Sequence, residues 1–272
     1  MKSKTIFTKK DVVSVLCCGV FLLMIFWPVG SCRRRQDQTQ QREQARLAAC
    51  QANLKQWGFI FSMYTIDNDG YFFNGEGSDS GRWWIDPMWP YYRQNKGLFL
   101  CPEATDSYSR GGRNPFGAWQ VDSDLGSYGA NGWICNPPEG KTELWGHGPI
   151  ENYWRTHNIK GAGYIPLLLD SMWVEAWPRH TDSPLPWEDW LKDKVSENTM
   201  KVNDNEMRRF CVNRHKGFVN GLFMDFSVRK VGLKELWTRK WHRNYETNGP
   251  WTLAGGCQPM NWPEWMRNFR DY

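Results

Sequence analysis

The residues whose types could do chemistry include a histidine and an aspartate in the last third of the chain. His215 and Asp225 are separated by nine residues, and apolar segments typical of strands lie at 219–224 and 227–231. A catalytic base and its orienting acid must lie within hydrogen-bond reach, which neighbouring strands can provide. However, the chain has no GxSxG, HExxH or paired-histidine pattern. We therefore expect no enzyme activity, and a structural role in which His215 bonds the backbone or Asp225 and holds the hairpin.

A second candidate site is a partial match to the twelve-residue calcium loop. The segment 65–76 has the sequence TIDNDGYFFNGE, in which Asp67, Asp69, Gly70 and Glu76 occupy four expected places. Thr65 stands where the first aspartate of the loop should be. An acidic turn that ends a helix explains the segment equally well. Calcium, bound by Asp67, Asp69 and Glu76, is the one cofactor that the sequence brings into consideration.

The chain contains eight cysteines, none of them in a CxxC pair, so a zinc ribbon is not expected. Cys17 and Cys18 lie in an apolar run and are interpreted as apolar side chains. If the rest of the chain is exported, disulfides are permitted, although the sequence does not specify their pairing. The candidate disulfide cysteines are Cys50, Cys101, Cys135, Cys211 and Cys257.

Tryptophan is unusually abundant, with 18 copies in 272 residues. Most should lie in the core, because a tryptophan has a large apolar surface and burying that surface stabilises the fold by several kcal/mol. A few exposed ones could instead form a stacking platform for sugar rings. The candidates for this alternative are Trp83, Trp84, Trp89, Trp173 and Trp177.

The element at the start of the chain is an apolar run at residues 12–30, VVSVLCCGVFLLMIFWPVG, which carries no charge. A bilayer core about 30 Å thick needs roughly 20 apolar residues in a helix, so this run is long enough for one crossing. Lysines precede it and Arg33, Arg34 and Arg35 follow it, which favours a membrane segment over a buried core helix. Because both flanks are basic, the positive-inside rule does not determine the orientation.

The positive charge of the chain belongs to this N-terminal segment. Residues 1–46 contain nine Lys/Arg and three Asp/Glu, whereas the remaining residues contain 25 and 26. A nucleic-acid-binding protein should carry a basic excess on its folded domain. We therefore expect no nucleic-acid partner.

An amphipathic helix is predicted to follow the membrane segment. Its apolar residues recur at intervals of three and four, which places them on one helix face: Leu47, Cys50, Leu54, Trp57, Phe61 and Tyr64. Gly58 weakens this helix by about 1 kcal/mol without ending it. We expect one helix from Asp11 to Tyr64.

The start of the chain resembles the processing segment of type IV pilins and type II secretion pseudopilins. The matching residues are Phe7-Thr8-Lys9-Lys10-Asp11, followed by the apolar run. The resemblance implies that a peptidase cuts before Phe7, that Asp11 replaces the usual membrane-embedded glutamate, and that Pro28 is the helix-loosening proline. Ile6 replaces the glycine that the peptidase normally requires.

The C-terminal third resembles the His-x9-Asp-Gly signature of a large group of prepilin-like bacterial proteins. The signature residues are His215, Gly217, Asn220 and Asp225, with Phe226 in place of the final glycine. Phenylalanine disfavours the positive φ of an Asp-Gly turn, so we expect a changed turn type. The segments Cys50 to Gln56 and Leu100-Cys101-Pro102 match the same group.

A bacterial lipobox is an alternative interpretation of the N-terminus. Val29-Gly30-Ser31-Cys32 follows a basic and then an apolar segment, as in signal peptides that are cut before a lipidated cysteine. Cys32 would then carry the anchor. Both interpretations export the remainder of the chain.

Together these features predict an α+β, pilin-like protein in which a long N-terminal helix, transmembrane and then amphipathic, packs on a small antiparallel sheet with loop-rich insertions. Its expected parts are a prepilin-like segment and membrane helix at 1–30, a stalk helix at 31–66, and a head at 67–272 that contains the hairpin region 207–231. Within the head we expect a buried strand at 165–173, strands at 210–212, 219–224 and 227–231, and a short helix at 187–195. A helix at 232–243 and the aromatic tail 244–272 are expected to pack back onto the sheet. We expect a single-pass protein of the bacterial inner membrane with a periplasmic head. The expected function is that of a non-enzymatic structural or adaptor subunit of a type II secretion or type IV filament system, whose partners are the membrane and other pseudopilin-like subunits. The resemblance also implies that the helix packs in a bundle of subunits through its apolar run and the stripe from Leu47 to Tyr64. The alternative is an anchored protein that binds glycan or an exported protein.

Overall fold

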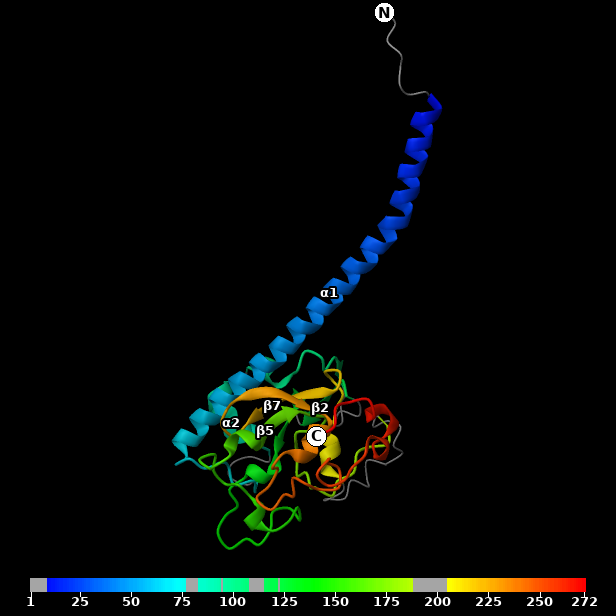
Figure 1. The fold of residues 1–272 in the computed structure, drawn as a ribbon. Coiled ribbons are helices and arrows are strands. Elements are labelled where there is room, and N and C mark those ends of the chain that lie inside the picture. Colours follow the sequence, from blue (N-terminus) through cyan, green and yellow to red (C-terminus); the bar gives the residue numbers. More distant parts are fainter. Residues whose placement is uncertain (1–8, 77–82, 94, 108–114, 122, 188–204) are drawn as a thin grey trace, which may run out of the picture. The chain divides into compact units, whose positions relative to one another are not determined.

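The computed structural model describes the backbone of residues 9–76, 83–93, 95–107, 115–121, 123–187 and 205–272, and the side chains of these ranges from Gln36 onward. It contains two compact units, Met1–Arg46 and Leu47–Tyr272. The long helix α1, Lys9–Asp67, contributes to both of them (Figure 1). The predicted N-terminal helix is thus confirmed over the part that starts at Gln36, and the last 21 residues of α1 belong to the head.

Several predictions for the N-terminus lie outside the residues whose side chains are described. These are the membrane crossing at 12–30 and the assigned roles of Phe7, Asp11, Pro28 and Cys32. In the part of the chain that is described with side chains, no helix has both the length and the apolar character that a bilayer crossing needs.

The head is built from short elements joined by long connections, and it is α+β. Its second helix is α2, Ile85–Tyr92. Its strands are β1 (Asp106–Ser107), β2 (Gly117–Val121), β3 (Asp124–Gly126), β4 (Tyr128–Asn131), β5 (Pro166–Asp170), β6 (Glu175–Ala176), β7 (Phe218–Phe223) and β8 (Val228–Gly232). Short 3-10 helices lie at Lys96–Phe99, Gly132–Ile134, Ile150–Asn152, Ala162–Tyr164, Glu206–Arg209, Lys234–Thr238, Pro259–Asn261 and Glu264–Met266.

The main sheet has five strands in the order β6-β4-β5-β7-β8. The pairs β4–β5, β5–β7 and β7–β8 are antiparallel, but β6 runs parallel to β4. The sheet is therefore mixed, and the prediction of a purely antiparallel sheet was wrong at this edge. A smaller, three-stranded sheet has the order β1-β2-β3, and its strands precede β4 along the chain.

The strands predicted from apolar segments are confirmed where they form the sheet centre. The buried segment at 165–173 contains β5, and the predicted hairpin strands at 219–224 and 227–231 are β7 and β8. The strand predicted at 210–212 was wrong, because these residues follow a 3-10 helix and their backbone N–H groups bond within local turns. The short helix predicted at 187–195 lies almost entirely outside the described residues.

The head end of α1 packs on the sheet through the predicted apolar stripe. Cys50, Leu54, Trp57, Phe61 and Tyr64 are all buried. Gly58 allows this close approach, because a Cβ at that position would lie 3.1 Å from Leu222 Cδ1 on β7. Trp57 extends the contact sideways, with edge-to-face rings from Trp84, Tyr92 and Phe99. Helix, sheet and aromatic residues therefore form one continuous core.

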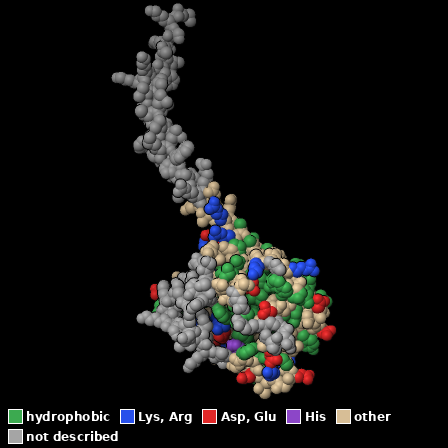
Figure 2. All heavy atoms as spheres, turned by 180° about the vertical axis from the view of Figure 1, so that it is seen from behind, with side chains coloured by type: hydrophobic (Ala, Val, Ile, Leu, Met, Phe, Trp, Pro, Cys, Tyr) green, Lys and Arg blue, Asp and Glu red, His purple; other side chains and the backbone are tan. Residues whose placement is uncertain are grey.

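The C-terminal segment packs back onto the sheet, as predicted. Trp241 stacks on Phe210, and its carbonyl oxygen accepts hydrogen bonds from Asn131 Nδ2 on β4 and from Trp154 Nε1. The helix expected at 232–243 is only a 3-10 helix, Lys234–Thr238. On the face of the head seen in Figure 2, acidic and basic side chains are interspersed, in keeping with the balanced charge of residues 47–272.

Candidate functional site

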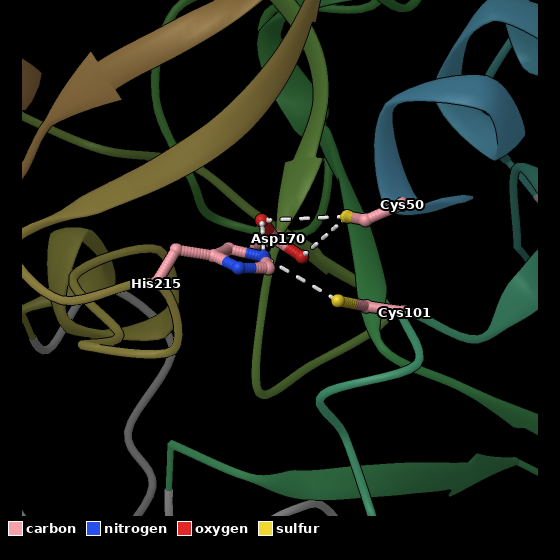
Figure 3. Close-up of side chains that lie close together, drawn as sticks. All are labelled: Cys50, Cys101, Asp170 and His215. Carbon is pink, nitrogen blue, oxygen red and sulfur yellow. Dashed lines mark hydrogen bonds and ion pairs between the residues drawn. The ribbon is translucent and has the colours of Figure 1, made fainter. Parts of the chain in front are cut away.

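Four side chains from distant parts of the sequence meet beneath α1, and we call them the four-residue cluster. Cys50 comes from α1, Cys101 from the segment after the 3-10 helix Lys96–Phe99, Asp170 from the last position of β5, and His215 from the segment before β7. One side-chain donor atom from each residue lies within 4.8 Å of all the others. Figure 3 shows the four side chains pointing toward one another from these elements.

Short contacts connect the members of the cluster in a chain. His215 Nε2 lies 3.1 Å from Asp170 Oδ2 and 3.4 Å from Cys101 Sγ. Cys50 Sγ lies 3.5 Å from Asp170 Oδ1. Asp170 therefore contacts both the helix and the segment before β7.

Arg214 lies behind the cluster and neutralises Asp170. Its Nη1 donates to Asp170 Oδ1 at 3.2 Å and to Ser127 O at 2.8 Å. The other two guanidinium nitrogens also donate: Nε donates to Pro115 O, and Nη2 donates to Gly117 O and Ser171 O. A buried guanidinium is tolerated only when its donors are satisfied, and the Arg214 side chain, which is 0% exposed, meets this condition.

Cys50 Sγ, which donates to Asp170, also accepts two hydrogen bonds. Tyr128 Oη and Asn220 Nδ2 both donate to it at 3.2 Å. The backbone N–H of Asn220 donates to Asp170 Oδ2 at 2.7 Å, and Asn220 Oδ1 accepts from Gln51 Nε2. Asn220 on β7 thus orients one sulfur and the carboxylate of the cluster at once.

Burial and charge act in opposite directions on these groups. Burial raises the pKa of Asp170, but the hydrogen bond with His215 and the charges of His215 and Arg214 outweigh it and lower this pKa to about 2. Burial lowers the pKa of His215, but hydrogen bonds with Asp170 and Cys101 raise it to about 9. Burial raises the pKa of Cys101, but hydrogen bonds with Cys50 and His215 bring it down to about 7. Burial is also the largest of the effects that raise the pKa of Cys50.

The chemistry open to this cluster is metal ligation or pairing of its two thiols. Thiolate, imidazole and carboxylate are all metal ligands, and two neighbouring thiols can also be oxidised to a disulfide. Cys50, Cys101 and Asp170 have no exposed surface. A substrate in solution would not reach them, so the geometry favours a role inside the fold.

The signature residues divide between this cluster and the turns around it. His215 and Asn220 belong to the site, but Asp225 does not. Asp225 is exposed, and its Oδ1 accepts from the backbone N–H and the hydroxyl of Ser227. We expected His215 to bond either the backbone or Asp225, and Asp225 was wrong, because the sheet register brings His215 to Asp170 instead. Gly217 has φ +99° and ends the loop before β7.

The turn after Asp225 also differs from the prediction. Phe226 adopts φ +61°, the left-handed conformation that we expected phenylalanine to avoid. Its N–H donates to Phe223 O, and its ring lies against His157. The turn and this ring contact offset a backbone cost of about 1–2 kcal/mol.

Sequence reasoning missed Asp170, and it gave no role of its own to Arg214, which precedes His215 in the signature. A signal existed for Asp170, because it directly follows the apolar residues 165–169 and is the only charged residue in 165–170. A charge buried with such a segment requires a partner. Arg214 is adjacent to His215, and its importance was not evident, since nothing in the sequence shows which exposed or buried position a loop arginine will take.

The candidate calcium ligands are not brought together. Asp67 accepts from Tyr91 Oη, and Glu76 pairs with Lys141 at 2.6 Å. Asp69 lies at φ +54° in the turn that ends α1. Among the described residues, the four-residue cluster is the only group of three or more metal-ligating side chains. The described structure therefore gives the calcium interpretation no support, and the acidic turn accounts for the segment.

The cysteines and tryptophans that the sequence singled out are mostly interior. Cys50, Cys101, Cys135, Cys211 and Cys257 are buried, free thiols. Trp84 and Trp177 were wrongly assigned to a sugar platform, because both are in the core: Trp84 Nε1 donates to Val174 O, and Trp177 stacks on His147. Trp83 and Trp173 are partly buried and meet edge to face, and Trp89 is 44% exposed.

In comparisons with known protein families, with characterised proteins and with solved structures, no significant match to this chain was found.

Proposed function

We propose that this protein is a membrane-anchored structural or adaptor subunit of a pilin-like assembly of the type II secretion kind, with its head exported from the bacterial inner membrane. The observation that carries the proposal is α1, which continues from Lys9 to Asp67 and packs the end of its length on the sheet of the head. Of the residues that resemble the prepilin processing segment, Lys9, Lys10 and Asp11 are the first three residues of this helix. Such a protein works by binding its neighbours, and no reaction is assigned to it.

The surface available to a neighbouring subunit is not the one expected from the sequence. The Leu47–Tyr64 stripe was predicted to pack in a bundle, but its members from Cys50 onward are buried by the protein's own head. A different set of apolar residues remains uncovered on α1: Phe59, Met63 and Ile66 are 69%, 43% and 74% exposed. Their spacing of four and three places them on one helix face. We assign the contact with other pseudopilin-like subunits to this exposed face.

The anchor is tested by fractionation and mass spectrometry of the mature protein. We expect the full-length chain in the membrane fraction, released by detergent and not by carbonate wash, with a methylated Phe7 as its N-terminus. An intact Met1 or a lipidated Cys32 would contradict the hypothesis that assembly depends on prepilin processing. Recovery of the chain in the aqueous fraction without detergent would overturn the proposal.

The subunit contact is tested by photo-crosslinking in intact membranes. A photo-reactive amino acid at Phe59 should give an adduct with a second copy of this chain or with another subunit that starts with a pilin-like helix. The matched control is the same amino acid at Leu253, which is 55% exposed but lies far along the chain in the C-terminal segment. Equal adducts from both positions, or none from Phe59, would exclude this face as the contact.

A further inference from the structure

The four-residue cluster combines donor types that suit one class of metal ion. Two cysteine sulfurs, one imidazole nitrogen and one carboxylate oxygen converge from Cys50, Cys101, His215 and Asp170. Calcium and magnesium require six or more oxygen ligands and do not match this set. Soft thiolates with imidazole select zinc and chemically similar divalent ions.

The four donor atoms lie close enough together to surround one ion. Zinc bonds of about 2.3 Å to sulfur and about 2.0–2.2 Å to nitrogen and oxygen place neighbouring ligand atoms about 3.3–3.8 Å apart. His215 Nε2 lies 3.4 Å from Cys101 Sγ and 3.1 Å from Asp170 Oδ2, and this oxygen lies 3.9 Å from Cys50 Sγ. One donor atom from each residue lies within 4.8 Å of all the others, so the ligands would shift slightly when an ion binds. With four ligands the coordination is complete, as in zinc sites of structural type.

The surroundings of the cluster also match a metal site. Cys50 Sγ accepts from both Tyr128 Oη and Asn220 Nδ2, and a thiolate accepts hydrogen bonds far better than a neutral thiol does. The Asp170 carboxylate is oriented by Arg214 and by the backbone N–H of Asn220. Such outer hydrogen bonds fix the direction of metal ligands and tune their basicity.

The charges balance around a divalent ion. Two thiolates and one carboxylate carry one negative charge more than such an ion neutralises. Arg214, whose side chain is completely buried, supplies the missing positive charge 3.2 Å from Asp170. A buried site with no net charge avoids the desolvation cost that an unbalanced one would carry.

From these observations we propose that Cys50, Cys101, Asp170 and His215 bind a divalent ion of the zinc class as a structural centre. The ligands lie far apart in the chain: Cys50 and Asp170 are separated by 120 residues, and Cys101 and His215 by 114. The ion joins α1 at Cys50 to strand β5 and to the segments before β1 and β7. Because the unfolded chain has no preformed site, metal binding adds directly to the stability of the fold.

The test uses the full-length protein, purified in detergent without chelators. We expect about one zinc ion per chain by elemental analysis. Cys101→Ser and His215→Ala should each lose most of this metal. The matched controls are Cys211→Ser, which removes a buried thiol outside the cluster, and Asp225→Asn, which changes a signature residue outside it. Both should keep their zinc.

A second measurement does not depend on whether the variants fold. Wild-type protein stripped of metal and reloaded with Co²⁺ should show the intense visible bands of tetrahedral cobalt and a thiolate-to-cobalt charge-transfer band. Chelation should lower the melting temperature, and Zn²⁺ but not Ca²⁺ should restore it. The proposal is overturned if the reduced wild-type protein binds neither ion, or if a non-reducing peptide map shows Cys50 and Cys101 joined in a disulfide. Equal metal content in the four variants would also overturn it.

Discussion

Asp170 and Arg214 illustrate how a buried ion pair is tolerated in this protein. The Asp170 carboxylate receives hydrogen bonds from Arg214, from the Asn220 backbone and from His215. Arg214 in turn bonds four carbonyl oxygens in addition to Asp170. Such a pair contributes more to the specificity of the arrangement than to net stability, but removing one partner leaves an uncompensated charge.

We predict that Arg214→Ala lowers the free energy of unfolding by about 3–5 kcal/mol, because it leaves Asp170 buried without its cation and several carbonyl oxygens without donors. Chemical denaturation followed by tryptophan fluorescence measures this. Arg270→Ala, at an exposed position, is the control and should change stability little. A loss of similar size in both variants would contradict this account of Asp170.

His147 predicts a pH dependence of stability on the acid side. Its ring stacks on Trp177 with centroids 3.5 Å apart, and burial, followed by the charges of Arg209 and Arg179, lowers its pKa from 6.5 to about 3. The unfolded chain therefore binds a proton at His147 that the folded chain does not bind. Stability should fall as the pH decreases from 6.5 toward 3, and this contribution is constant above that window.

The measurement is the melting temperature as a function of pH, for wild type and His147→Gln. The variant cannot take up this proton, so its melting temperature should decline less steeply between pH 6.5 and 3. The two slopes are compared, and not the absolute values, because the substitution also removes the ring stack. Identical slopes would show that His147 is protonated equally in the folded and unfolded chain.

At the scale of elements, α1 carries two apolar faces with different roles within the head. One face, from Cys50 to Tyr64, is buried against the sheet and α2, and the other, with Phe59, Met63 and Ile66, is exposed. Helical periodicity alone revealed the first face. Packing decided which of these two faces lies against the sheet. The β7–β8 hairpin can approach α1 closely only on the side of the helix where Gly58 lies.

The two faces should respond differently to truncation to alanine. Leu54→Ala removes a completely buried side chain and should cost about 2–5 kcal/mol of unfolding free energy through lost burial and a cavity. Phe59→Ala, at a side chain that is 69% exposed, should leave the stability of the isolated subunit nearly unchanged. Thermal and chemical unfolding of both variants give the comparison. A large loss in Phe59→Ala would mean that this face is covered within the subunit.

At the scale of the whole molecule, the chain separates into the unit Met1–Arg46 and the head Leu47–Tyr272. The core consists of residues from Cys50 onward, and the four-residue cluster lies entirely within the head. Folding of the head should therefore not require the N-terminal apolar run.

We predict that a chain starting at Gln36 folds with the melting temperature of the full-length head and is found in the aqueous fraction. The reason is that removal of residues 1–35 deletes the proposed anchor but no residue of the core. Fractionation combined with calorimetry separates the two effects. If the shortened chain remained with the membrane, the head itself would bind it, and the anchor would not reside in the apolar run.

The sequence by itself determined the elements whose signal is local. The apolar stripe of α1, the buried segment that becomes β5 and the hairpin β7–β8 all follow from periodicity, which is a property of neighbouring residues. It was also sufficient to single out His215, Asn220, Cys50 and Cys101, through patterns that resemble those of prepilin-like proteins.

Only the tertiary structure decided which of these residues meet. His215 was expected to bond the backbone or Asp225, ten positions along the chain. It contacts Asp170, 45 positions away, because β5 and β7 are neighbours in the sheet. The parallel pairing of β6, the burial of Trp84 and Trp177, and the left-handed Phe226 were likewise outside the reach of local patterns. Sheet register and core packing are set by contacts between residues far apart in sequence, and such contacts leave no periodic trace in the chain.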